Sequence, residues 1–146
     1  MNSENTKFDI PFRLLYTMIR VADLERSVAF YKSALGMNEL RRENFTEGRF
    51  TIVFVGYGNE TSNALIELTY NWNEVNYEIG TGYGHIALMV SDIYAACKRF
   101  ENMDVKIVME PGPMTYAADE TGHKEEIAFI EDPDGYKIEL IQASVN

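Results

Sequence analysis

The chain contains one sequence unit twice, and this repeat limits the folds open to it. The stretch "RLLYTMIRVADLERSVAFY" matches "YGHIALMVSDIYAACKRF": when Tyr16 is aligned with His85, 69 positions later, Asp23 falls on Asp92. In each copy, alternation with period two is followed by an aspartate and then by apolar residues at helical spacing. Each copy is therefore expected to begin with a strand and continue as a helix whose start is capped by Asp23 or Asp92.

The rest of each copy has the pattern of further strands. The apolar stripes expected on the helices are Leu24, Val28 and Tyr31 in the first copy and Ile93, Ala96, Cys97 and Phe100 in the second. Strand-like segments follow, which are "FTIVFVGYG" and "NALIELTY" in the first copy and "VKIVME", "EIAFIED" and "YKIELIQ" in the second. The pattern predicts an α+β fold of two repeated βαβββ units with curved mixed sheets. The units run over about 11–72 and 82–143, within a single domain covering 1–146.

The last strand of each unit contains the same tripeptide, Ile-Glu-Leu, around Glu67 and Glu139. Because side chains alternate along a strand, both glutamates should point away from the helix-packed side. A single glutamate of this kind usually lies on a solvated sheet face. Two that are related by a repeat, each with Tyr16 or His85 on the first strand of its unit, favour a divalent-metal site with open positions.

Composition narrows the choice of partner. The 146 residues are 46% hydrophobic and carry a net charge of −10, which argues against nucleic acid and anionic membranes and favours a small molecule. No apolar run approaches the roughly 20 residues of a spanning helix, and the start "MNSENTKFDIP" is polar, so we expect a cytoplasmic protein. The single cysteine, Cys97, is expected to be a buried small hydrophobe; the alternative is a nucleophile.

Six segments in order resemble glyoxalase I (lactoylglutathione lyase), of the vicinal oxygen chelate superfamily. They are "TMIRV", "SVAFYKSALGM", "FVGYG", "ALIELTYNW", "YGHIAL" and "EDPDGYKIELI", and the resemblance extends from Leu14 to Ile141. It implies metal-dependent isomerisation of the methylglyoxal–glutathione hemithioacetal to S-lactoylglutathione, which detoxifies methylglyoxal. It also implies a homodimer in which each active site combines first-half ligands of one subunit with second-half ligands of the other.

The resemblance also assigns roles to residues of the predicted site. Glu67, His85 and Glu139 would bind one divalent ion, Ni²⁺ in first place and Zn²⁺ in second, with Tyr16 at the position of a fourth ligand. Glu139 would be the general base, and Glu67 its symmetric catalytic partner.

The same resemblance implies that Arg20 and Asn71 bind glutathione. Without it, Arg20 would be a surface cation at a strand end, and Asn71 a loop residue next to Trp72.

Tyr16 departs from the family pattern, which has histidine in close bacterial relatives and glutamine in animal enzymes. Because a free phenol keeps its proton at neutral pH, it is a poorer ligand than imidazole. Three alternatives stay open: a tyrosine that binds the metal directly or through water, a site with three protein ligands, and a site that has lost its metal.

Two other functions compete with the lyase. One is a non-enzymatic protein of the same superfamily that binds and sequesters a small molecule. The other is a lyase-like metalloenzyme whose activity is altered because Tyr16 replaces the usual histidine. The long acidic loop over 111–126 leaves open whether glutathione is the thiol used.

Overall fold

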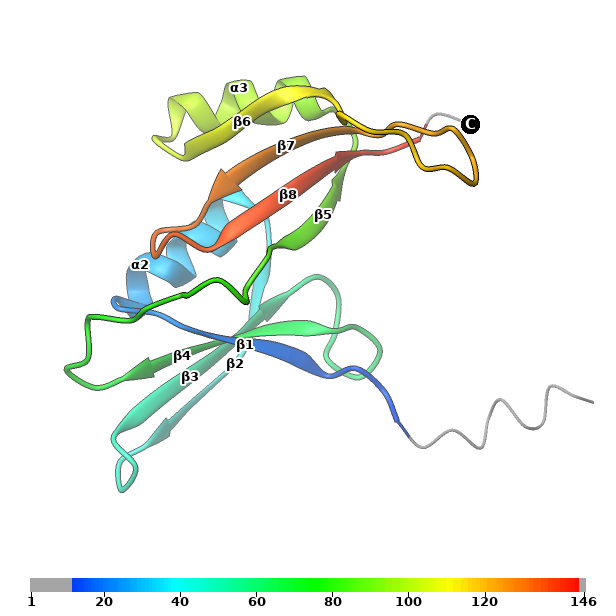
Figure 1. Cartoon of the computed structure of the whole chain (residues 1–146). Helices are drawn as coiled ribbons and strands as arrows, with labels where there is room; N and C mark the ends of the chain where they lie inside the picture. Colours follow the sequence, from blue (N-terminus) through cyan, green and yellow to red (C-terminus); the bar gives the residue numbers. More distant parts are fainter. Residues whose placement is uncertain (1–11, 145–146) are drawn as a thin grey trace, which may run out of the picture.

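The computed structural model describes residues 12–144, and the polar start considered above, at residues 1–11, lies outside that range. Within it, the elements form two similar runs, each with one strand, then a helical segment and then three strands (Figure 1). In chain order the elements are β1 (Tyr16–Arg20), α2 (Leu24–Ala29), the short π-helix η1 (Phe30–Ala34), β2 (Asn38–Phe45), β3 (Phe50–Gly56), β4 (Leu65–Asn71), β5 (Ile86–Val90), α3 (Ile93–Asn102), β6 (Lys106–Pro113), β7 (Glu126–Glu131) and β8 (Lys137–Gln142).

The strands form two four-stranded sheets with the same topology. The order is β1-β4-β3-β2 in the first sheet and β5-β8-β7-β6 in the second. In each sheet the first and last strands of the unit run parallel and the other pairs run antiparallel. Figure 1 shows the first sheet at the bottom of the view and the second above it. The expected α+β fold of two repeated βαβββ units with mixed sheets is confirmed.

The two helices begin as the repeat predicted. The side chain of Asp23 accepts a hydrogen bond from the backbone N–H of Arg26, and Asp92 accepts one from Ala95, so both aspartates are N-caps. The expected apolar stripes are buried, except that Ala96 is only partly buried. None of the helices in the described range is long and apolar enough to span a bilayer.

One strand, β2, is missing from the sequence-based prediction. Its sequence "NELRRENF" has few apolar residues, because it lies at the edge of the first sheet and its arginines pair with glutamates instead of entering the core. The predicted loop over 111–126 is also shorter than expected, since β6 continues through Pro113 and β7 begins at Glu126. Charged edge strands carry little of the apolar alternation on which sequence patterns depend.

The two halves share one apolar core, and hydrogen bonds between polar groups also join them. The core includes buried residues of α2, η1, α3 and both sheets. The turn between β7 and β8 also contacts the first half: Asp134 accepts hydrogen bonds from the Ala22 backbone N–H at 2.9 Å and from Ser27 Oγ at 3.1 Å. Tyr31 donates to Asp132 at 2.7 Å. The shared core supports the single domain, which stays a prediction.

Candidate metal and substrate site

The Ile-Glu-Leu tripeptides place their glutamates as alternation predicted. Ile66 and Leu68 are buried in the core, and so are Ile138 and Leu140. The glutamate between each pair lies on the opposite face of its sheet and is only partly buried. The helix-packed face of each sheet is thus apolar, and the other face carries a carboxylate.

In the second sheet, His85 and Glu139 come together. His85 Nε2 lies 3.1 Å from Glu139 Oε1, with the His85 side chain 41% exposed and that of Glu139 15% exposed. The imidazole also lies edge-on to Phe129, with ring centroids 5.2 Å apart, and Phe129 is the residue opposite Glu139 on β7. These contacts hold an imidazole nitrogen and a carboxylate oxygen at one point on the sheet.

In the first sheet, Tyr16 and Glu67 lie at the related positions but form no hydrogen bond with each other. The Tyr16 ring is edge-on to Phe54, with centroids 5.1 Å apart, and Phe54 is opposite Glu67 on β3. Glu67 Oε2 instead accepts a hydrogen bond from Thr69 Oγ1 at 2.6 Å. Within residues 12–144 the Tyr16 hydroxyl makes no hydrogen bond, and the residue is 42% exposed.

One chain therefore carries two repeat-related pairs on two different sheets, which we call half-sites. Tyr16 and Glu67 form the first half-site, and His85 and Glu139 form the second. Among the described residues, no group of three or more histidine, cysteine, aspartate or glutamate side chains is placed to hold a metal. The donor types nevertheless fit a divalent ion, because an imidazole and two carboxylates with open positions are typical of catalytic sites. His85 and Glu139 already converge within this chain, and Glu67 is held on the other sheet.

Arg20 and Asn71 lie together at the end of the first sheet. Arg20 lines a pocket of about 520 Å³, together with Tyr77, and Asn71 Nδ2 donates to the Tyr77 hydroxyl at 3.4 Å. Asn71 is four residues beyond Glu67 on β4, which at the rise of a strand is about 13 Å. The structure thus places the two predicted glutathione-binding residues beside one pocket, a short distance along the sheet from the carboxylate.

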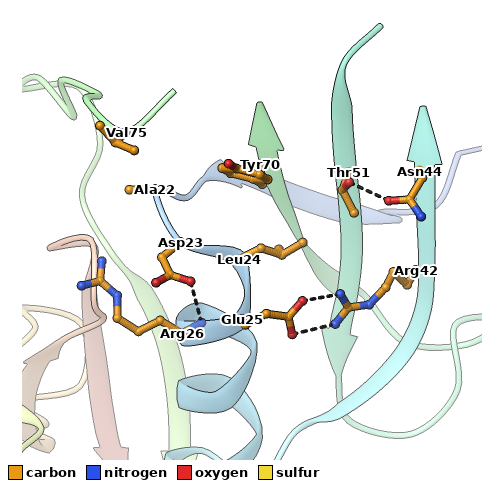
Figure 2. Close-up of a pocket in the computed structure, with 10 residues that line it drawn as sticks. All are labelled: Ala22, Asp23, Leu24, Glu25, Arg26, Arg42, Asn44, Thr51, Tyr70 and Val75. Atoms are coloured by element: carbon orange, nitrogen blue, oxygen red, sulfur yellow. Dashed lines mark hydrogen bonds and ion pairs between the residues drawn. The ribbon is translucent and has the colours of Figure 1, made fainter. Parts of the chain in front are cut away.

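A second pocket, of about 630 Å³, lies near the start of α2 (Figure 2). It is lined by residues of α2 and by Thr51 and Tyr70, which belong to the helix side of the first sheet and not to the Glu67 face. Its Arg42 is paired with Glu25 at 2.6 Å. This pocket is therefore separate from both half-sites, and the charge of its Arg42 is already compensated.

Cys97 is part of the core. It is 2% exposed, and burial raises the pKa of its thiol. Because the thiolate is the reactive form, this environment makes a nucleophile less reactive. The interpretation of Cys97 as a small buried hydrophobe is confirmed.

Several residues near the half-sites were missed from the sequence. Thr69 could have been found, because it lies two positions after Glu67 and so on the same face of the strand. Phe54 and Phe129 depend on strand register, which the sequence does not give across loops of different length. Tyr136, whose hydroxyl donates to the Arg20 carbonyl at 2.8 Å, depends on contact between the halves.

Comparison with known proteins places the chain in a family. Residues 13–140 match the Glyoxalase/Bleomycin resistance protein/Dioxygenase superfamily, and the chain belongs to this superfamily. It is 54% identical over 131 residues to a probable lactoylglutathione lyase of Synechocystis sp., covering 90% of this chain and 95% of that one. It is 52% identical over 130 residues to a lactoylglutathione lyase of Neisseria meningitidis, covering 89% and 90% of the two chains.

Solved structures agree with the sequence relatives. Glyoxalase I from Zea mays superposes with a TM-score of 0.82 at 39% identity over 92% of this chain, which spans only 46% of the maize chain. The trypanothione-dependent glyoxalase I of Leishmania major superposes with a TM-score of 0.75 at 43% identity, covering 90% of this chain and 86% of that one. These comparisons confirm the family resemblance and the expected class of lyase, and the glyoxalase I relatives imply a divalent metal cofactor.

Proposed function

We propose that this chain is a metal-dependent lactoylglutathione lyase, which isomerises the methylglyoxal–glutathione hemithioacetal to S-lactoylglutathione. The observation that carries the proposal is the pair of repeat-related half-sites, one with Glu67 and one with His85 and Glu139, in a chain about half identical to lactoylglutathione lyases. A protein that only sequesters a ligand has no need of two carboxylates and an imidazole turned away from the core.

Two copies of the chain would complete each active site. Glu67 of one subunit would meet His85 and Glu139 of the other, because the two half-sites of a single chain lie on different sheets. Apolar side chains beside the half-sites are exposed in the single chain: Met18, opposite Glu67, is 39% exposed and Met89 is 76% exposed. Burial of such residues between two identical faces would stabilise a homodimer.

The ion proposed is Ni²⁺ in first place and Zn²⁺ in second, an order that rests on the family resemblance. Glu67, His85 and Glu139 would hold it, and an imidazole with two carboxylates suits either ion. When bound, such an ion supplies a Lewis acid that polarises the substrate oxygens. His85 Nε2 lies 3.1 Å from Glu139 Oε1, so the two donor atoms are close enough to bind one ion together.

Glu139 and Glu67 would carry out the proton transfer. Glu139 would remove the proton from C1 of the hemithioacetal and return a proton to C2. Its low exposure shields the carboxylate from bulk water, which limits loss of the proton to solvent. Glu67, fixed by Thr69, would have the same role toward the opposite face of the substrate.

Arg20 and Asn71 would hold the glutathione part. Along the sheet, Asn71 is about 13 Å from Glu67 and Arg20 about 7 Å, since Arg20 lies two positions beyond Met18, which is opposite Glu67. An arginine and an amide at these distances from the carboxylate suit a tripeptide with a carboxylate at its end. The cytoplasm is the location proposed for the enzyme, because its single cysteine, Cys97, is free and cannot form an internal disulfide, which fits a reducing compartment.

The test is a metal analysis followed by an absorbance assay for thioester formation from methylglyoxal and glutathione. Glu139→Gln should keep the fold and lower turnover by about 10²-fold or more, because it removes a positioned base. Glu101→Gln, the same change at an exposed position of α3, is the matched control and should keep full turnover. Near-normal turnover in Glu139→Gln would transfer the base role to Glu67, and a metal-loaded wild type that forms no thioester would refute the lyase.

A further inference from the structure

We propose that Tyr16 is not a metal ligand. The ion has three protein donors, Glu67, His85 and Glu139, and the Tyr16 ring lines the site beside an open coordination position. This inference rests on the proposed lyase function. It concerns the aligned position on the first strand of each unit where the second half has its histidine donor, His85, and the first half has Tyr16.

The internal repeat supplies the comparison. Met18 is opposite Glu67 in the first sheet as Ala87 is opposite Glu139 in the second, so Tyr16 and His85 stand at the same distance along the strand from their glutamates. Both rings also lie edge-on to a phenylalanine, at 5.1 Å and 66° for Tyr16 and at 5.2 Å and 78° for His85. The backbone and the ring position are therefore equivalent, and only the chemistry of the ring differs.

The glutamates obtain their polar partners in different ways. Glu139 is contacted by His85 at 3.1 Å, whereas Glu67 accepts its hydrogen bond from Thr69 at 2.6 Å. The second half has Ile141 two residues after its glutamate, where the first half has Thr69, and isoleucine cannot donate. In the first half, Thr69 thus does for Glu67 what His85 does for Glu139, and Tyr16 is not required for it.

The Tyr16 ring is packed as the His85 ring is, but its hydroxyl does not lie where His85 has its coordinating nitrogen. The Tyr16 ring packs edge-on with Phe54, and the Arg41 guanidinium lies over the Phe54 ring, 4.2 Å from its centroid. Arg41 is itself paired with Glu60. A phenol hydroxyl is farther from its backbone than an imidazole nitrogen. With the two rings equivalently placed, Tyr16 has carbon atoms where His85 has Nε2, and its hydroxyl extends past that point.

Titration of metal-stripped protein with Ni²⁺ and with Zn²⁺ in a calorimeter tests this inference. Tyr16→Phe should bind each ion within about threefold of wild type, because loss even of an outer-shell partner of a metal ligand costs about 10–100-fold. Tyr16→His should bind at least about tenfold more tightly, because it adds a fourth donor. Tyr116→Phe, which removes a hydroxyl at an 81% exposed position between β6 and β7, is the matched control and should match wild type.

Ultraviolet difference spectra of the same titrations show directly whether a tyrosine becomes ionised when metal binds. Metal binding to wild type should produce no band of ionised tyrosine. A band that appears in wild type and disappears in Tyr16→Phe, or a loss of affinity of about tenfold or more in Tyr16→Phe, would overturn the inference. A wild type that binds metal as expected but forms no thioester would contradict the proposed lyase while leaving the three-donor site intact, and a wild type that binds no metal would overturn both.

Discussion

At the scale of single residues, Thr69 decides whether Glu67 is ready to bind a metal. It is 7% exposed, and its hydroxyl donates to Glu67 Oε2 at 2.6 Å. A carboxylate fixed in this way loses less conformational freedom when an ion binds.

Thr69→Val should therefore weaken metal binding by about 10-fold while preserving the shape of the side chain. Calorimetric titration of metal-stripped protein measures the effect. Thr17→Val, at an exposed position of β1, is the control and should leave the affinity unchanged. Equal affinities for the two variants would mean that Thr69 does not orient the ligand.

The sequence predicts residues of this kind only where they share a strand with a residue already identified. Glu67 and Glu139 could be placed on the right face because alternation is a local property. The phenylalanines that fix Tyr16 and His85 could not, because the strands that carry them are joined to the glutamate strands by loops of different length.

At the scale of elements, the turn between β7 and β8 connects the two halves through buried polar groups. Burial raises the pKa of Asp132, and the hydrogen bond from Tyr31 partly offsets this rise. Burial and the neighbouring carboxylate in turn raise the pKa of Tyr31, so the hydroxyl keeps its proton and remains a donor. The turn is thus held to η1 by a charge-assisted hydrogen bond inside the core.

Tyr31→Phe should lower the free energy of unfolding by about 1–3 kcal/mol near neutral pH, because the buried Asp132 carboxylate loses one of its three hydrogen-bond donors. The sign of the pH dependence follows from the raised pKa of Asp132. The stability that this group contributes is greatest below its unfolded pKa and falls as the pH rises through its folded pKa, and Tyr31→Phe raises the folded pKa further. The destabilisation should therefore be larger at about pH 7 than at about pH 4.

Urea unfolding at the two pH values measures this difference. Tyr116→Phe, at an 81% exposed position, is the control and should not change stability at either pH. A Tyr31→Phe effect that is equal at both pH values would show that Asp132 does not change its ionisation in this range.

Elements also differ in how far the sequence predicts them. The helix starts at Asp23 and Asp92 follow from capping chemistry and needed no tertiary information. Strand β2 could not be predicted, because its charged residues satisfy one another at the sheet edge and leave no apolar alternation to detect.

At the scale of the whole molecule, the two half-sites of one chain lie on different sheets. An experiment can therefore show whether each active site takes its residues from one subunit or from two. If each site takes Glu67 from one subunit and Glu139 from the other, a dimer of one Glu67→Gln chain and one Glu139→Gln chain has one site with both changes. Its other site is fully wild type.

Each variant alone should be nearly inactive, and a mixture allowed to exchange subunits should recover about a quarter of the wild-type turnover. Half of the dimers are then mixed, and each mixed dimer has one intact site of two. The thioester assay before and after exchange measures the recovery, and light scattering checks that both variants are dimers. A chain carrying both changes, mixed with either single variant, is the control and should recover nothing, because no pairing then yields an intact site. Were each site built within one chain, the mixture of single variants would stay as inactive as its components, and the intersubunit arrangement would have to be abandoned.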